Sequence, residues 1–345
     1  MAASLTLPGF VNAHSHAFQR ALRGSVAGGD FWAWRDAMLA AAQAQTPETV
    51  RAEYAATYRE MLAAGYTAVG EFHYLGLAEA HAAHAAADEA GIELVLLYAA
   101  YGRGGLERFR QRSAAAYLQD VEALRGAGAR VGLAPHSVRA CPVEWLDEIG
   151  AYAERERLVL HVHADEQPRE IEDCLAEHGV RPIELLARAG CLTPGTTVVH
   201  ATHADDRELD LLADAGARIC LCPTTEANLG DGFAPVERIV ERGIALCIGS
   251  DSNVRIDPFE ELRELEGIAR RTHQRRNVLA PETLLRYGAD EGARALGIES
   301  WAEIEIDLEH RSLRGIDTDD VRAALVFGCG ADVVRAARRR GSARA

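Results

Sequence analysis

The chain has 345 residues, of which 48% are hydrophobic, and its 37 basic and 52 acidic side chains give a formal net charge of −15. This length allows a single large α/β barrel, and the hydrophobic content is sufficient for a large core. The strongly acidic balance argues against nucleic acid and against an anionic membrane as partners, and an anionic substrate would need arginines placed close to it.

The first predicted strand ends in a His-x-His pair. An apolar run follows Pro8 and Gly9 in the stretch LPGFVNAHSH, and His14 and His16 stand at its end. Residues i and i+2 of a strand point to the same face, so both imidazoles can be directed at one point. Two converging neutral imidazoles are typical of half of a zinc or iron site. The alternative is a pair of polar residues in a loop, and the rest of the chain has to decide between the two.

Strands and helices then alternate along the chain. Near-continuous apolar strands indicate burial on both faces, and eight strand–helix units with right-handed crossovers predict a (β/α)8 TIM barrel over residues 1–295. A doubly wound open sheet is the alternative, but no G-x-G-x-x-G loop follows the first strand. The seven later strands are predicted at 67–74, 92–99, 130–134, 158–163, 196–200, 217–221 and 245–249, and the helices at 31–45, 47–64, 78–90, 113–124, 142–156, 169–177, 181–189, 206–215, 235–242, 258–272 and 281–295.

The segment after residue 295 is less regular. Residues 302–308 alternate apolar and acidic side chains, as a half-exposed strand does, and residues 321–328 are apolar. The Arg- and Ala-rich tail over residues 335–345 is predicted to be a frayed helix or a disordered end. We therefore divide the chain into a barrel of residues 1–295 and an irregular C-terminal segment of residues 296–345.

Further metal-binding side chains stand at the predicted strand ends. A parallel barrel keeps its chemistry at the carboxyl ends of its strands, so a metal site at the His-x-His pair requires ligands at other strand ends. One such residue alone has a structural role more often than not, but several at the same end of separate strands favour a site over coincidence. They are His163 and Glu166 at the fifth strand, His200 at the sixth and Asp251 directly after the eighth.

This constellation resembles the signature of the amidohydrolase superfamily, which has a His-x-His on strand one, histidines on strands five and six, and an aspartate on strand eight. The stretches GFVNAHSHAFQRALRG, APHSVRA, HVHADEQPREIEDC and VVHATHAD are similar to the formimidoylglutamate deiminase family within it. The resemblance covers the predicted barrel from Pro8 to Ala295. It implies a zinc-dependent hydrolase of linear amidines that converts N-formimino-L-glutamate to N-formyl-L-glutamate and ammonia, a step of histidine degradation.

The resemblance also implies roles for individual residues. One Zn²⁺ per chain is expected, although imidazole and carboxylate ligands also suit Fe²⁺ or Mn²⁺. Spacing alone leaves His161 and His203 open as alternatives to His163 and His200, and we select the latter because His163 stands nearer its strand end and His200 directly on its strand. The implied metal ligands are His14, His16, His163 and Asp251, the implied catalytic residues are Glu166, His200 and Asp251, and the implied substrate contacts are Gln19, Tyr74, His136 and Arg139.

In the implied reaction, Glu166 carries a proton from the attacking water to the leaving nitrogen, and His200 stabilises the tetrahedral adduct. Asp251 accepts the remaining hydroxyl proton. The small-molecule substrate is a dianion, and the planar guanidinium of Arg139 can bind one of its carboxylates through two hydrogen bonds. A second carboxylate contact should exist, and the candidates are Arg20 and Arg23.

The chain departs from this family at both ends. Family members carry a small β-sandwich built from segments before the first barrel strand and after the last helix, whereas here both segments are short. We therefore expect the sandwich to be vestigial or absent. Two alternative functions stay open: a related deaminase of guanine-like or other amino-heterocyclic substrates, and a truncated barrel with impaired activity.

The sequence also contains signals about the compartment. It has no basic region followed by the long apolar run of a signal peptide, and no apolar run approaches membrane-spanning length. Its seven cysteines lack Cys-x-x-Cys spacing, which is typical of reduced core thiols. We therefore expect a cytoplasmic protein, and the resemblance suggests a homodimer.

Overall fold

The structure, a computed structural model, describes residues 4–24 and 28–338. Its centre is a sheet of eight parallel strands whose order in space follows their order in the chain. Apart from the first residues of three of them, the strands are buried throughout, as their apolar sequences predict. They are β2 (Phe10–Ser15), β3 (Tyr66–His73), β4 (Glu93–Ala100), β5 (Val131–Pro135), β6 (Leu160–Ala164), β7 (Thr196–His200), β8 (Arg218–Leu221) and β9 (Ala245–Ile248).

The sheet closes into a barrel where the chain after β9 meets β2. Ser15 and Asp251 form a parallel bridge. The backbone N–H of Asp251 donates to the carbonyl of His14 at 3.0 Å, and the N–H of His16 donates to the carbonyl of Asp251 at 2.8 Å. Gly249 allows this approach, because a Cβ there would lie 2.7 Å from the His14 carbonyl oxygen. The predicted (β/α)8 barrel is therefore confirmed.

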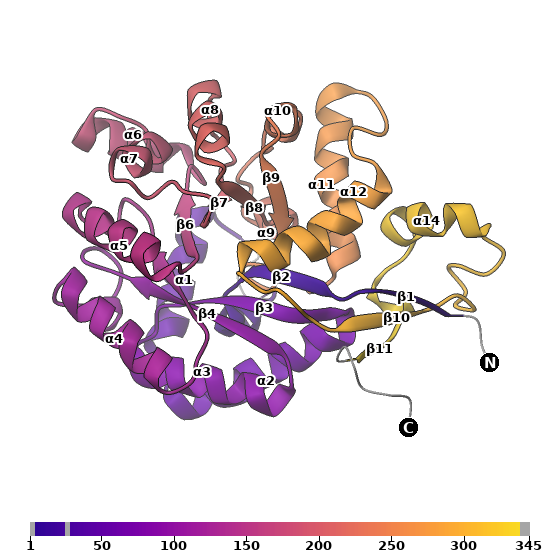
Figure 1. Cartoon of the computed structure of the whole chain (residues 1–345), viewed down its shortest axis with the longest axis horizontal. Coiled ribbons are helices and arrows are strands. Elements are labelled where there is room, and N and C mark those ends of the chain that lie inside the picture. The colour runs from indigo at the N-terminus through magenta and orange to yellow at the C-terminus, as the bar shows by residue number, and fades with distance from the viewer. Residues whose placement is uncertain (1–3, 25–27, 339–345) are drawn as a thin grey trace.

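Helices connect the strands and surround them (Figure 1). Thr46 and Thr49 form a capping box at the start of α2, and Gly65 ends this helix with a left-handed backbone at φ 100°. A π-helical turn (Tyr287–Glu291) interrupts the last helix of the barrel. The helices are α1 (Phe31–Gln43), α2 (Pro47–Ala64), α3 (Leu77–Ala90), α4 (Ala114–Gly126), α5 (Val143–Glu156), α6 (Pro168–His178), α7 (Pro182–Arg188), α8 (Asp206–Ala215), α9 (Pro223–Leu229), α10 (Val236–Glu241), α11 (Pro258–His273), α12 (Pro281–Arg286), α13 (Gly292–Ala295) and α14 (Val321–Gly328).

A second sheet of three antiparallel strands lies beside the barrel (Figure 1). Strand β10 (Glu303–Asp307) is its centre and pairs with β1 (Ser4–Pro8) and with β11 (Val334–Arg338). In β10 the side chains of Ile304 and Ile306 are buried and those between them are partly exposed. This alternation is the one that the sequence predicts for a half-exposed strand.

One expectation about the chain ends is corrected. Residues 334–338 form a strand instead of a frayed helix or a disordered end, and residues 339–345 of the predicted tail lie outside the described residues. The short stretch before the barrel also forms a strand of its own, β1. Both strands are stabilised by pairing with β10, which is distant from β1 in the chain. The local sequence therefore gives little indication that they are strands.

One hydrophobic core extends from the barrel to the small sheet. Ile306 of β10 and Leu325 of α14 belong to the same buried cluster as Val69 and Leu97 of the barrel strands. All seven cysteines are buried and unpaired, as expected of core thiols. In the part of the chain that the structure describes, no helix combines the length and apolar character needed to cross a bilayer.

Candidate metal centre and active site

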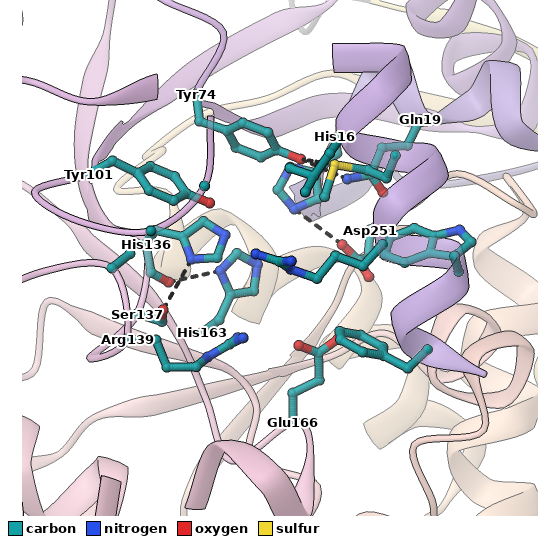
Figure 2. Close-up of a pocket in the computed structure, with 18 of the residues that line it drawn as sticks. His16, Gln19, Tyr74, Tyr101, His136, Ser137, Arg139, His163, Glu166 and Asp251 are labelled. Atoms are coloured by element: carbon teal, nitrogen blue, oxygen red, sulfur yellow. Dashed lines mark hydrogen bonds and ion pairs between the residues drawn. The ribbon is translucent and has the colours of Figure 1, made fainter. Parts of the chain in front are cut away.

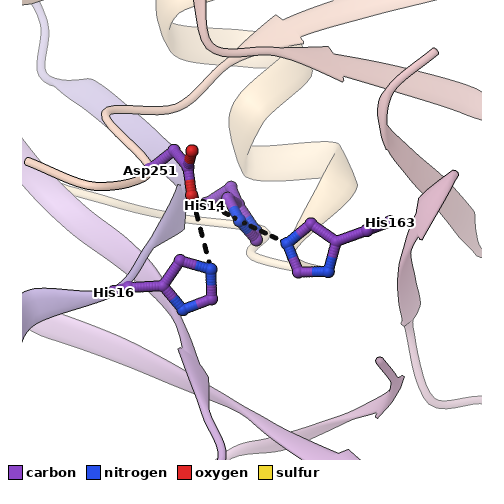
Figure 3. A group of neighbouring side chains, drawn as sticks. All are labelled: His14, His16, His163 and Asp251. Carbon is purple, nitrogen blue, oxygen red and sulfur yellow. Dashed lines mark hydrogen bonds and ion pairs between the residues drawn. The ribbon is translucent and has the colours of Figure 1, made fainter. Parts of the chain in front are cut away.

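Four side chains converge at the carboxyl end of the barrel strands (Figure 3). His14 and His16 come from the end of β2, His163 from β6, and Asp251 from the segment after β9. All four are buried, and one potential ligand atom of each lies within 4.8 Å of the others. Oδ1 of Asp251 is 3.2 Å from His14 Nε2 and 3.3 Å from His16 Nε2. The structure therefore brings together the four residues that the sequence singled out as ligands.

Backbone carbonyls orient two of these imidazoles. His16 Nδ1 lies 2.9 Å from the carbonyl oxygen of Phe72, and His163 Nδ1 lies 3.0 Å from that of His136. A carbonyl only accepts, so both Nδ1 atoms carry the hydrogen and both Nε2 atoms present a lone pair. Burial lowers the pKa of His14 to about 3 and also lowers the pKa of His16 and of His163, so all three rings are neutral near pH 7.

The donor atoms fit a divalent metal ion. Nε2 of His14 lies 3.1 Å from Nε2 of His163 and 3.2 Å from Oδ1 of Asp251, and one hydrogen on this nitrogen can be directed at only one of these two acceptors. A bound cation would attract both imidazole nitrogens and the carboxylate oxygen at once. Bonds of about 2.1 Å at tetrahedral angles place neighbouring ligand atoms about 3.4 Å apart, which is close to these separations. Three imidazoles and one carboxylate suit Zn²⁺, Fe²⁺ or Mn²⁺.

The carboxylate of this cluster is kept ionised. Although burial raises the pKa of a carboxyl group, the hydrogen bond with His14 and the nearby His16 hold the pKa of Asp251 below its usual range. The backbone of Asp251 has a φ of 42° and that of His200 a φ of 74°, a region that residues other than glycine rarely adopt. Such strained residues concentrate at functional sites.

Glu166 and His200 form a second group next to the cluster. Glu166 follows β6, His200 ends β7, and Nε2 of His200 lies 3.7 Å from Oε1 of Glu166. Burial raises the pKa of Glu166 to about 6, although His200 and Arg139 oppose the shift. Burial disfavours the charged ring of His200, but the carboxylates of Glu166 and Glu226 outweigh it and raise its pKa to about 10. A carboxylate with a pKa near neutrality beside an imidazolium is suited to proton transfer.

Glu226 was not among the residues that the sequence singled out. It lies on α9, is 1% exposed, and its Oε1 is 3.2 Å from Nδ1 of His200. The sequence pattern predicts no helix at α9, because seven residues are too few to show a helical periodicity. The proline at its first position and Gly230 after its end were the signals available.

A cavity of about 740 Å³, part of it open to solvent, leads to this centre. Figure 2 shows Tyr101, His136 and Arg139 on one side of it, and Gln19 and Asp251 on the other. Hydrophobic side chains of α1 also line the cavity. All the substrate contacts expected from the sequence therefore lie in one cavity together with Glu166 and His200: Gln19, Tyr74, His136 and Arg139.

Gln19 offers an unused acceptor in this cavity. Its Nε2 donates to the hydroxyl of Tyr74 at 2.9 Å, which fixes the amide orientation. Its Oε1 is buried and has no hydrogen-bond partner among residues 4–24 and 28–338. A buried carbonyl oxygen without a partner costs free energy, so this atom favours a ligand that carries an N–H group.

Two guanidinium groups give one part of the cavity a positive charge. Arg139 donates from Nε to Glu170 at 3.3 Å, and its remaining N–H groups bond to no other described residue. Arg35 of α1 lines the same cavity and forms no ion pair within the described part of the chain. Burial lowers the pKa of His136 well below its usual value, and the charges of Arg139 and Arg35 add to this shift. An anionic group bound here meets two cations.

Arg20 and Arg23, which the sequence offered as the second carboxylate contact, do not line the cavity. Arg20 donates to Glu60 at 2.5 Å, and Arg23 donates to the same carboxylate at 2.8 Å. Arg35 lies in the cavity instead. The sequence does not single out Arg35, because an arginine on an amphipathic helix usually belongs to the solvated face.

The unselected histidines lie outside the metal cluster. Nε2 of His161 contacts the carbonyl of Ala295 at 2.9 Å, and Nε2 of His203 contacts that of Asp231 at 2.7 Å. Both rings therefore have structural hydrogen bonds that do not point at the cluster.

Residues 5–305 match the amidohydrolase family. The chain belongs to this family. Enzymes of this family are hydrolases that use a divalent metal, which agrees with the donor set at the barrel end.

Two curated relatives of this amidohydrolase are deaminases with different substrates. The formimidoylglutamate deiminase of Pseudomonas aeruginosa is 39% identical over 326 aligned residues, which cover 84% of this chain and 72% of the relative. A 5-methylthioadenosine/S-adenosylhomocysteine deaminase of Haloarcula marismortui is 30% identical and covers 86% of this chain and 69% of the relative. The two names agree on deamination and differ in the substrate.

Solved structures show the same architecture. An amidohydrolase from Brucella melitensis superposes with a TM-score of 0.87 at 34% identity, covering 97% of this chain and 86% of that one. An adenosine deaminase from Xanthomonas campestris with bound zinc gives a TM-score of 0.90 at 23% identity, covering 98% and 80%. At this low identity, the similarity to the adenosine deaminase is evidence for the fold alone.

Proposed function

We propose that this amidohydrolase hydrolyses N-formimino-L-glutamate to N-formyl-L-glutamate and ammonia, with Zn²⁺ held by His14, His16, His163 and Asp251. The observation that carries the proposal is one cavity that joins this cluster to two guanidinium groups with free donors, Arg139 and Arg35. A substrate with two carboxylates and a hydrolysable formimino group matches both ends of this cavity: the carboxylates match the guanidinium groups, and the formimino group matches the metal cluster. The 39% identical relative named for this activity supports the same substrate.

The proposed chemistry divides among three side chains. A bound divalent ion supplies Lewis acidity, which lowers the pKa of water from ~15.7 to ~7. The formimino group enters as its protonated amidinium; Glu166 accepts a proton of the attacking water and delivers it to the leaving nitrogen, which then carries three hydrogens and departs as ammonia. His200, charged and directed by its Nε2 towards Glu166, donates a hydrogen bond to the tetrahedral adduct. Asp251 accepts the remaining hydroxyl proton as the adduct collapses to the formyl group.

The remaining cavity residues bind and orient the substrate. Arg139 and Arg35 each bind one carboxylate of the glutamate part. Gln19 accepts a hydrogen bond from the formimino N–H through its unpartnered Oε1, while Tyr74 holds the amide. His136 stays neutral beside Arg139 and contributes a hydrogen-bonding ring edge to the same wall.

The function is tested by ammonia release from a panel of substrates. We expect N-formimino-L-glutamate to give the highest kcat/KM, above guanine, adenosine and 5-methylthioadenosine. A specific observation favours the second candidate, a deaminase of an amino-heterocycle: the aromatic rings of Phe31, Trp34 and Tyr101 line the cavity and could stack on a base. Preferential turnover of any ring substrate would contradict the proposal and support this candidate.

Removing the guanidinium of Arg139 tests the carboxylate contact. We expect Arg139→Met to raise KM for N-formimino-L-glutamate by about 10- to 100-fold, since a charge-assisted hydrogen bond contributes about 1.5–3 kcal/mol. Arg20→Met is the matched control, because Arg20 pairs with Glu60 and does not line the cavity. Steady-state kinetics measure both variants, and equal KM values for the two would exclude Arg139 as a contact.

The pH dependence follows from Glu166. Its ionised form accepts the proton, and burial raises its pKa to about 6, so this form is lost at a higher pH than for an exposed glutamate. We therefore expect kcat/KM to fall with a slope of one proton as the pH decreases through about 6. Circular dichroism at each pH controls for unfolding. A rate that stays constant down to pH 5 would show that Glu166 is not the base.

A further inference from the structure

His200 lies between two buried carboxylates. Its Nε2 faces Glu166 at 3.7 Å, and its Nδ1 is 3.2 Å from Oε1 of Glu226. Glu166 belongs to the proposed proton transfer, but Glu226 has no part in it. Glu226 is 1% exposed and does not line the cavity. Among the proposed catalytic residues, its contact is with His200.

The Glu226 carboxylate has a fixed position. The oxygen that faces His200 also accepts the backbone N–H of Cys222 at 2.9 Å. The neighbouring Thr225 donates from its hydroxyl to the carbonyl of Ser250 at 3.2 Å, which ties α9 to the segment that carries Asp251. Glu226 is thus anchored to the same part of the barrel end as the metal cluster.

The Glu226 carboxylate determines the tautomer and the orientation of the His200 ring. Because a carboxylate only accepts, Nδ1 carries a hydrogen and Nε2 is directed to the side of Glu166. The backbone at this position is strained, since His200 and Ala201 have left-handed φ values of 74° and 50°. A catalytic histidine oriented by a third, buried group is the arrangement on which triads depend.

We propose that Glu226 is a positioning residue, which fixes the ring of His200 so that Nε2 points at the reacting centre. The inference rests on the proposed function, in which His200 stabilises the adduct. It adds a requirement outside the cavity: α9 has to be in place for His200 to act.

A double-mutant cycle tests the inference. We expect Glu226→Met to lower kcat for N-formimino-L-glutamate by at least about tenfold, with the metal content unchanged and KM within about threefold. Glu226→Gln retains an acceptor and recovers part of the loss. In a His200→Asn background, Glu226→Met has no further effect, because the group through which it acts is gone.

The matched control is Glu261→Met. Glu261 is also buried and accepts the backbone N–H of Thr224 at 3.0 Å, so its loss also removes an acceptor at the start of α9. It does not touch His200, and we expect kcat to stay within about threefold. If Glu261→Met lowers kcat as much as Glu226→Met, or if Glu226→Met multiplies the loss in the His200→Asn background, the role of Glu226 is general support of α9 and the inference is wrong.

A second measurement does not depend on the substrate. In zinc-loaded protein labelled with ¹⁵N at histidine, the ring signals missing from His200→Asn identify His200. We expect a protonated Nδ1, and a shift of these signals in Glu226→Met but not in Glu261→Met. Absence of that shift overturns the inference. A wild-type protein that releases no ammonia from N-formimino-L-glutamate but shows the shift would refute the proposed function and leave the Glu226–His200 contact supported.

Discussion

Replacing Glu166 by glutamine is expected to lower kcat for N-formimino-L-glutamate by about 10²- to 10⁴-fold, the usual contribution of general acid–base catalysis. The amide has nearly the same shape but cannot accept the proton of the attacking water. Glu166 lies 3.7 Å from His200 and is not one of the four clustered side chains, so the metal content should stay unchanged. Stopped ammonia assays and metal analysis of the same preparation measure both quantities.

Glu184→Gln is the control for this substitution. Glu184 is also a largely buried carboxylate, but its ion pairs with Arg188 and Arg207 lie outside the cavity. We expect its variant to keep the wild-type kcat. If Glu166→Gln retains more than about a tenth of the wild-type rate, another group transfers the proton and the role given to Glu166 is wrong.

Removing a ligand should abolish both metal binding and activity. We expect His163→Ala to lose the stoichiometric zinc and all measurable ammonia release, because the cluster then has three donors and a void. A ligand that binds the folded state stabilises it by about 2.7 kcal/mol at 100 times its Kd and about 4.1 kcal/mol at 1,000 times. The melting temperature of wild-type protein should therefore rise on addition of zinc, and that of His163→Ala should not.

His161→Gln is the matched control on the same strand. His161 is buried two residues before His163, but its Nε2 contacts the carbonyl of Ala295 and not the cluster. This variant should keep the zinc and the zinc-dependent rise in melting temperature, even where its stability is lower. Loss of zinc in His161→Gln with retention in His163→Ala would show that the wrong histidine of the pair was selected.

Much of the site could be predicted because it obeys a simple geometric rule. His14, His163, His200 and Asp251 each stand at the carboxyl end of a short apolar strand, and parallel strands of a barrel bring these ends together. The His-x-His period of two placed His14 and His16 on one face. Strand and helix positions followed from apolar runs and from caps such as Thr46 before Pro47.

What the sequence did not reveal depends on contacts between distant segments. Strands β1 and β11 exist because both pair with β10. Glu226 lies on a helix too short to show a period, and its role is visible only from its 3.2 Å contact with His200, 26 residues away. Arg35 resembles a surface arginine in the sequence, and only the placement of α1 over the cavity shows otherwise. Arg20 and Arg23 were closer in sequence to the metal pair but turn towards Glu60.

The most direct test is a titration of metal-free protein with zinc while ammonia release from N-formimino-L-glutamate is measured. We expect no activity without metal and a linear rise to a plateau at one zinc per chain, with the same titration silent in His163→Ala. Activity that is independent of zinc, or no ammonia at any zinc content, would contradict a hydrolytic centre built on these four side chains.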